Sequence, residues 1–186
     1  MKKVMLSVAL LLAANLFAEA KIGTVDLMLL VRNHPNYESN KALLTATDKD
    51  YQKKLDAIKA EGEKLQEEGR KIAEQMNNPM LKEKAKADVE KQLMDLQKQL
   101  MQIEQRYRNE AMRFRQELQD LEGRLLKTTT DDLKKRISSY AEENGYDFIF
   151  DTTVTAYAKR EYNVTDELLK NMGVDPKDVK GVDESK

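Results

Sequence analysis

The chain has 186 residues, of which 35% are charged and 6% aromatic, and its formal net charge at pH 7 is −1. So polar a composition excludes a large globular core and favours a long solvated structure with a small domain. The chain contains no cysteine, which excludes a disulfide, a thiol nucleophile and a lipoprotein attachment point.

The first twenty residues have the pattern of a secretory signal peptide. Lys2 and Lys3 precede an apolar run, and Ala18-Glu19-Ala20 is an A-x-A cleavage site. The alternative, a membrane anchor, needs an apolar run of ~20 residues, which is longer than this one. We therefore expect an exported, soluble chain that begins at Lys21. Its 30 basic and 32 acidic residues give a net charge of −2, which argues against a protein devoted to nucleic acid.

The mature chain is expected to open with short elements over residues 21–36. Ile22 to Leu27 has the pattern of a strand, and the apolar run from Leu27 to Val31 that of a helical turn. Pro35 then disfavours helix at His34, so this segment is predicted to turn.

The stretch 37–144 is made mainly of strong helix formers and contains one proline, Pro79. Asn78 is placed to cap a second helix, with Pro79 at its first position, where a missing N–H costs nothing. Apolar residues recur every seven positions before the break, and step by four and three after it with a stutter at Ala111. These residues are Leu44, Tyr51, Ile58, Leu65 and Ile72, then Val89, Leu93, Leu96, Leu100, Ile103, Tyr107, Phe114, Leu118, Leu121 and Leu125. The pattern predicts a long antiparallel coiled-coil hairpin with its tip near residues 77–80.

Short elements are expected again after the hairpin. Strands are predicted over 146–151 and 154–158, the latter with room to continue to Tyr162. A last helix over 166–172 is predicted to be capped by Thr165 and closed by Gly173, and the charged residues 173–186 are expected to be disordered.

A hairpin brings its own ends together, so the strands before and after it must meet. The fold class is therefore α+β, mostly α: a hairpin over 37–144 inserted in a β-rich body over 21–36 and 145–172. So small a sheet is marginal alone, and self-association would let several bodies share one core. The residues expected to form that oligomerisation body are Ile22, Val25, Phe148, Phe150 and Tyr157.

The mature chain up to about Met172 resembles the Skp/OmpH family of periplasmic chaperones. The resemblance rests on Lys21-Ile22-Gly23-Thr24-Val25-Asp26, on His34-Pro35-Asn36-Tyr37 and on the hairpin. It continues through Gly145-Tyr146-Asp147-Phe148-Ile149-Phe150-Asp151, Ala156-Tyr157-Ala158 and Asn163-Val164-Thr165-Asp166-Glu167-Leu168-Leu169. The resemblance implies a homotrimer with a central β-body and three helical tentacles around a cavity. That cavity would hold unfolded outer-membrane proteins in the periplasm without ATP. The resemblance also implies contact with membrane lipid or lipopolysaccharide, which a pI near 6.0 predicts to be weak here.

A protein that holds unfolded chains needs adaptable apolar surface, which methionine provides. The candidate client-binding residues are Met94 and Met101, beside the seam formed by the periodic apolar residues of the hairpin, with Met76, Met80 and Leu81 at the tip. The alternative is that these side chains complete the packing of the hairpin.

Basic residues near the tip form a second candidate surface, for acidic clients or lipid phosphates. They are Arg70, Lys71, Lys82, Lys84 and Lys86. Interleaved acidic residues favour the alternative of a solvated mixed-charge face. Gly62 and Gly69 either allow this helical arm of the hairpin to bend or admit bulky side chains from the other helix. The second interpretation is favoured.

No catalytic constellation, metal cluster or cofactor-binding motif is found. His34 is the only histidine, and we interpret it as structural or merely exposed. Asn163 lies in a glycosylation sequon with Glu161 two residues before it, as bacterial oligosaccharyl transfer requires, although Thr165 also suits a helix cap. The sequence therefore predicts a non-enzymatic, ATP-independent periplasmic holdase. A structural spacer or adaptor of the cell envelope is the alternative.

Overall fold

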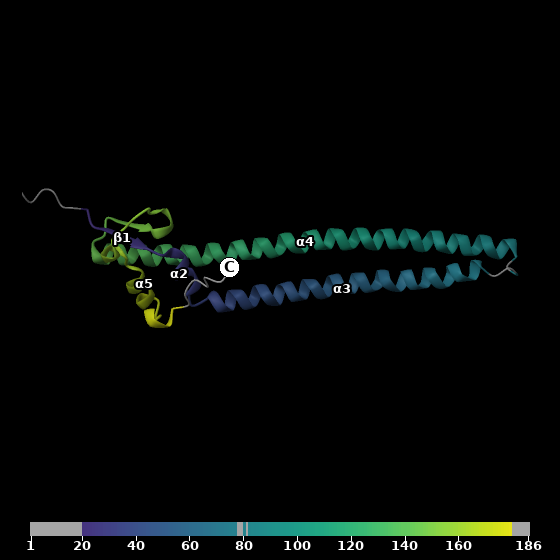
Figure 1. The fold of residues 1–186 in the computed structure, drawn as a ribbon, viewed down its shortest axis with the longest axis horizontal. Helices are drawn as coiled ribbons and strands as arrows, with labels where there is room; N and C mark the ends of the chain where they lie inside the picture. Colours follow the sequence, from purple (N-terminus) through teal and green to yellow (C-terminus); the bar gives the residue numbers. More distant parts are fainter. Residues whose placement is uncertain (1–19, 78–79, 81, 180–186) are drawn as a thin grey trace, which may run out of the picture. The chain divides into compact units, whose positions relative to one another are not determined.

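The computed structural model describes residues 20–77, 80 and 82–179, so the signal peptide, Asn78, Pro79 and the predicted tip residue Leu81 lie outside the described residues. The described chain forms two compact units. One combines the residues up to Tyr37 with those from Lys127 onward, and the other is Glu38–Leu126. In chain order the elements are β1 (Ile22–Val25), α2 (Leu27–Arg32), α3 (Tyr37–Met76), α4 (Glu83–Asn144), β2 (Phe148–Asp151), the 3₁₀ turns η1 (Thr152–Val154) and η2 (Arg160–Tyr162), α5 (Thr165–Asn171) and η3 (Pro176–Asp178) (Figure 1).

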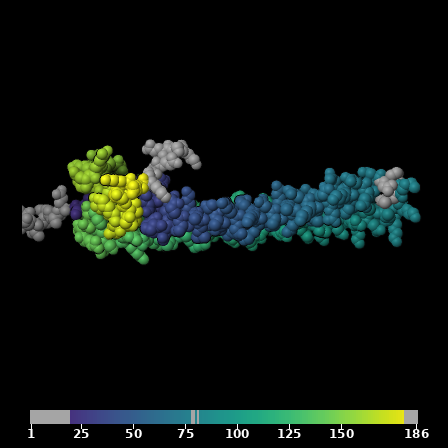
Figure 2. Space-filling model, turned by 90° about the horizontal axis from the view of Figure 1, so that it is seen from below, coloured from purple at the N-terminus to yellow at the C-terminus, as the bar shows by residue number. Residues whose placement is uncertain are grey.

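The first unit contains a two-stranded parallel sheet. Ile22 lies opposite Phe148 and Val25 opposite Asp151, in register along the four residues of each strand. Figure 2 shows that the purple, green and yellow segments of this unit gather together although they are far apart in the sequence. The prediction that strands from the two ends of the helical stretch pair with each other is confirmed.

A small apolar core lies between β1, α2, α5 and the last turns of α4. Its fully buried side chains are Leu30, Leu133, Leu168 and Leu169, and Val25, Val164 and Met172 complete it. Each fully buried leucine contributes about 1.5–3 kcal/mol relative to an exposed one. The core therefore depends on α5, a helix of seven residues, as much as on the long helices.

Local hydrogen bonds define where the helices of this unit begin and end. The Asp26 carboxylate caps α2 by accepting from the Leu29 amide at 2.8 Å. At the end of α4, Gly145 has a φ of +67°, and the Tyr146 amide donates to the Ala141 carbonyl at 2.9 Å. This left-handed glycine ends α4 and turns the chain directly into β2.

The predicted third strand over 154–158 is wrong for the single chain. Asp151 accepts from the Thr153 amide at 3.0 Å, and its carbonyl accepts from the Thr155 hydroxyl, so the chain turns into η1 instead. The sheet has only two strands within the described residues, and Asn163 adds an isolated bridge to Thr24. Residues 154–158 favour a strand by composition, but no strand of the described chain lies beside them to pair with.

Two predictions for the C-terminal region are also wrong. Thr165 is not the cap of α5 but its first residue; its hydroxyl accepts instead from the Asp26 amide at 2.9 Å. The tail is ordered to residue 179 rather than disordered from 173, because Val174 and Val179 pack against the core and Asp175 caps η3. Residues 180–186 lie outside the described residues.

In the second unit, α3 and α4 contact each other through residue pairs that run in opposite sequence order. Tyr51 stacks on Phe114, and Glu61 forms an ion pair with Arg106. Further along α3, Gly69 faces Leu96. The buried positions of the seam are Leu55, Ile58, Val89, Leu96 and Phe114, and the last four are among the periodic apolar positions predicted from the sequence.

Candidate functional site

The small sheet presents an apolar face to solvent. The rings of Phe148 and Phe150 are 54% and 45% exposed, and they stack with centroids 5.9 Å apart. Ile22, in register with Phe148, is 41% exposed, and Tyr157 is 82% exposed. Val25 differs from these residues because its side chain is buried in the core of its own chain. Strand alternation explains why Phe148 and Phe150 are exposed together, since Ile149 between them packs against the core.

In the described part of the chain, β2 has one strand neighbour, which is β1. Its other edge is thus a row of backbone groups able to pair with another strand. The exposed aromatic face and this edge lie on the same four-residue strand.

An aromatic stack joins the two helices of the second unit. The rings of Tyr51 and Phe114 are nearly parallel, with centroids 4.3 Å apart, and the Tyr51 hydroxyl donates to Glu117 at 2.7 Å. That hydrogen bond to a carboxylate raises the pKa of Tyr51. The Lys54 ammonium lies 5.5 Å from the Tyr51 ring, within reach of a cation–π contact. The heptad pattern identified both aromatic positions but not their pairing.

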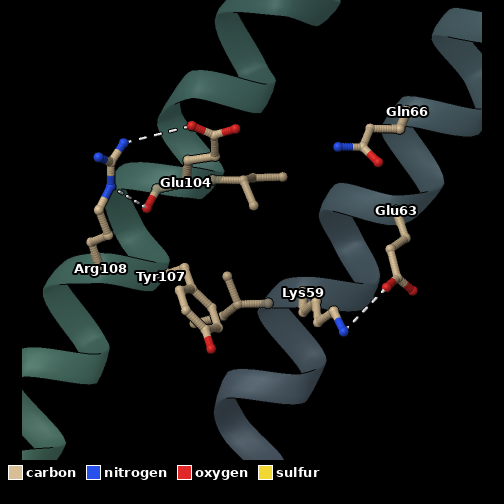
Figure 3. Close-up of a pocket in the computed structure, with 8 residues that line it drawn as sticks. Lys59, Glu63, Gln66, Glu104, Tyr107 and Arg108 are labelled. Atoms are coloured by element: carbon tan, nitrogen blue, oxygen red, sulfur yellow. Dashed lines mark hydrogen bonds and ion pairs between the residues drawn. The ribbon is translucent and has the colours of Figure 1, made fainter.

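A groove of about 490 Å³ lies between α3 and α4. Its apolar lining comes from Ile58, Ile103 and Tyr107. Figure 3 shows charged side chains around it that pair along their own helices, Lys59 with Glu63 at 3.7 Å on α3 and Arg108 with Glu104 at 3.6 Å on α4. Tyr107 is the seam position immediately before the predicted stutter at Ala111, and it is 38% exposed.

The two glycines of the seam face side chains of α4. A Cβ added at Gly62 would lie 3.4 Å from the Ile103 Cγ2, and one at Gly69 would lie 4.0 Å from the Leu96 Cδ1. These distances agree with the interpretation that bulky side chains approach the glycines, and they are ordinary van der Waals contacts. Bending of the arm at the glycines stays a prediction.

The methionines singled out from the sequence are exposed. Met94 is 68% exposed, Met101 57% and Met80 86%, whereas Met76 is half-buried. The first three therefore do not complete the packing between α3 and α4. Met112 was missed by sequence reasoning although it is 71% exposed; its spacing of eleven residues from Met101, about three helical turns, was the available signal.

The basic residues near the tip belong to a mixed-charge surface. Arg70 and Lys71 pair with Glu67 at 2.8 and 3.6 Å, and Lys86 pairs with Glu83 at 3.3 Å. The hydrogen bond from Arg70 lowers the pKa of the Glu67 carboxyl. Lys82 and Lys84 are exposed and form no ion pair in the part of the chain that the structure describes. The solvated-face interpretation accounts for three of the five cations.

His34 is a structural residue. It is 7% exposed; its Nε2 lies 3.0 Å from the Asp132 carboxylate, and its Nδ1 accepts from the Asn36 amide at 3.1 Å. Arg136 donates to the same carboxylate at 2.7 Å, and this bond, followed by that of His34, lowers the pKa of Asp132. The cluster ties the turn before α3 to α4.

The sequon around Asn163 is held in a folded turn. The Asn163 side-chain oxygen accepts from the Thr165 amide at 2.9 Å, and the buried Thr165 hydroxyl is occupied by Asp26. Although Asn163 is exposed, the threonine that a transferase must reach is therefore not accessible in this fold.

Within residues 20–77, 80 and 82–179, no group of three or more side chains is placed to hold a metal ion. No helix within the same ranges is both long enough and apolar enough to cross a membrane.

Comparison with known proteins identifies the family of this chain. The family model described as outer membrane protein (OmpH-like) matches residues 21–172. The chain belongs to the OmpH-like family. That match begins at the predicted mature N-terminus and includes both units of the fold. Members of this family are periplasmic chaperones rather than enzymes, so the family points to the handling of outer-membrane proteins. A comparison with curated proteins found no match.

Proposed function

We propose that this protein is an ATP-independent periplasmic holdase that binds unfolded outer-membrane proteins and prevents their aggregation. The match of residues 21–172 to the OmpH-like family is the observation that carries the proposal. The exposed methionines of α4 support it, because flexible, polarizable side chains adapt to clients of many sequences. The signal peptide would direct export of the chain and would be cleaved after Ala20.

The working form of the chaperone is a homotrimer. The exposed face formed by Ile22, Phe148 and Phe150 supports this assembly, because apolar side chains that are exposed side by side are typical of interaction surfaces. The free edge of β2 supports it as well, since a strand from another copy would complete the ladder. Three bodies would then share one core, and three antiparallel coiled-coil arms would enclose the client cavity as tentacles.

Contact with lipid or lipopolysaccharide is a minor part of the proposal. The mature chain has a net charge of −2, and most of the cations near the tip are already paired with carboxylates. Long-range attraction to an anionic membrane is therefore weak.

The test is the mass of residues 21–186 by light scattering, alone and with a urea-unfolded outer-membrane porin diluted into the solution without ATP. The proposal expects the mass of three chains alone, and a soluble complex with the porin at stoichiometric amounts. A monomer, or an oligomer that leaves the porin to aggregate, would instead favour a structural spacer of the cell envelope.

A further inference from the structure

Three exposed methionines form a line along α4. Met94, Met101 and Met112 are 68%, 57% and 71% exposed. They are separated by seven and eleven residues, which correspond to about two and three turns of an α-helix. Leu126, another fourteen residues on and 52% exposed, continues the same line after about four turns. We call Met94, Met101 and Met112 the methionine stripe.

The stripe lies on the side of α4 away from α3. The residue two positions after each methionine is a seam residue: Leu96, Ile103 and Phe114 in turn. Two residues correspond to about 200° around a helix, so each methionine and its seam residue occupy opposite sides. Leu96 and Phe114 are 7% and 5% exposed. The packing of the two helices therefore explains the seam but does not explain the stripe.

The charges beside the stripe are mainly positive. From residue 94 to 119, three cations, Lys98, Arg108 and Arg115, and one acidic residue, Glu104, lie within about 60° of the nearest methionine around the helix. Arg108 pairs with Glu104, whereas Lys98 and Arg115 form no ion pair within the ranges that the structure describes. This local excess contrasts with the net charge of −1 of the whole chain. An occupant with carboxylates beside apolar side chains would complement it.

We propose that the methionine stripe binds extended client segments that combine apolar and acidic residues, such as one unfolded membrane strand of an outer-membrane protein. This inference rests on the proposed holdase function and assigns the face of the arm that meets the client. Apolar client side chains cover the methionines, and client carboxylates meet Lys98 and Arg115.

The length of the stripe suits such a segment. Met94 and Met112 are eighteen residues apart, a rise of about 27 Å along a helix. A membrane-spanning β-strand of about 9–11 residues measures about 30–36 Å when extended. Its side chains alternate between apolar and polar, so one face of the extended segment is apolar along its whole length.

The first experiment measures the rate of methionine oxidation by dilute hydrogen peroxide, residue by residue, with mass spectrometry. The full mature chain is compared alone and bound to the urea-unfolded porin. Client binding should slow oxidation of the three stripe methionines at least about fivefold and leave Met28, which is 52% exposed on α2, unchanged. Slow oxidation of the stripe before any client is added would overturn the inference in favour of coverage by a second copy.

The second experiment compares Met112→Gln with Leu43→Gln. Both positions are exposed helical sites, 71% and 47%, but Leu43 lies on α3 and outside the stripe. Glutamine has nearly the helix propensity of methionine, so the arm should keep its structure. The chain has no tryptophan, so tryptophan fluorescence of the client reports binding without background.

The expected result is that Met112→Gln weakens client binding about threefold, and that the triple variant of the stripe weakens it at least about tenfold. Leu43→Gln should leave the affinity unchanged. Equal affinities for all variants, with a soluble client complex still formed, would reject the stripe while the holdase function stands. Failure of the unmodified chain to form any complex would reject the proposed function itself.

Discussion

Alanine at Gly62 should stabilise the arm, not strain it. Gly62 and Gly69 are both inside α3, and a glycine in a helix interior costs about 0.8–1.0 kcal/mol relative to alanine. The added methyl group at Gly62 would meet the Ile103 Cγ2 at 3.4 Å, and at Gly69 the Leu96 Cδ1 at 4.0 Å. Neither contact is a clash, so the new methyl groups also bury a little apolar surface.

Gly123 in α4 provides the matched control, because a Cβ there meets nothing within 4 Å. Gly123→Ala should raise the free energy of unfolding by about 1 kcal/mol through helix propensity alone. Gly62→Ala should equal or exceed this value, and the combination with Gly69→Ala should give about 2 kcal/mol, since sites about 10 Å apart usually add.

The assay is urea unfolding of the mature chain, followed by far-ultraviolet circular dichroism at one fixed protein concentration, because self-association would make stability depend on concentration. Solution X-ray scattering of the same variants tests bending, since a flexible arm should stiffen. Loss of stability in Gly62→Ala, with a gain in Gly123→Ala, would refute the reasoning. Ile103 would then require the space that glycine leaves.

Three further predictions follow from the remaining contacts. Phe114→Ala should lower the free energy of unfolding by about 3–5 kcal/mol, because the ring is 5% exposed and stacked on Tyr51; urea unfolding measures this, and a loss below about 1 kcal/mol would contradict the stack. Phe148→Glu should reduce the mass seen by light scattering without changing the helical content, because the ring is exposed in the single chain; an unchanged mass would exclude this face from the proposed trimer interface. The lowered pKa of Asp132 means that its carboxylate stabilises the fold above its ordinary pKa of about 3.9 and that this contribution is lost as the pH falls through the lowered value. Asp132→Asn should therefore destabilise the protein at pH 7, by less than about 1 kcal/mol because the side chain is partly exposed, and the difference should shrink near pH 3; a difference that grows with acid would contradict it.

The core of the body shows why part of the fold was predictable. Strand pairing followed from topology, since a helical stretch that folds back must bring Ile22 and Phe148 close together. The burial of Val25 within its own chain could not be predicted, because alternation along a strand says which residues share a face but not which face is covered. That choice was made by α5, whose Leu168 and Leu169 fill the core.

The local sequence was misleading where a side chain had two available partners. Thr165 has the composition of a helix cap, but its hydroxyl bonds the Asp26 amide, 139 residues away. Val174 and Val179 lie in a charged tail, yet two apolar side chains are enough to order it once a core is present. Neither the Asp26 amide nor the apolar core can be recognised as a partner from the residues that are adjacent in the sequence.

The sequence by itself determined the helical stretches and the residues of their seam, and its flanking motifs already showed the resemblance to a chaperone family. The helical stretches and the seam depend on periodicity and composition, which local interactions fix. Only the tertiary structure decided that 154–158 turns instead of pairing, that Tyr51 stacks on Phe114, and that the methionines stand opposite the seam in solvent. Each of these depends on where a distant segment lies, because burial and hydrogen bonding are settled by the neighbours that folding supplies.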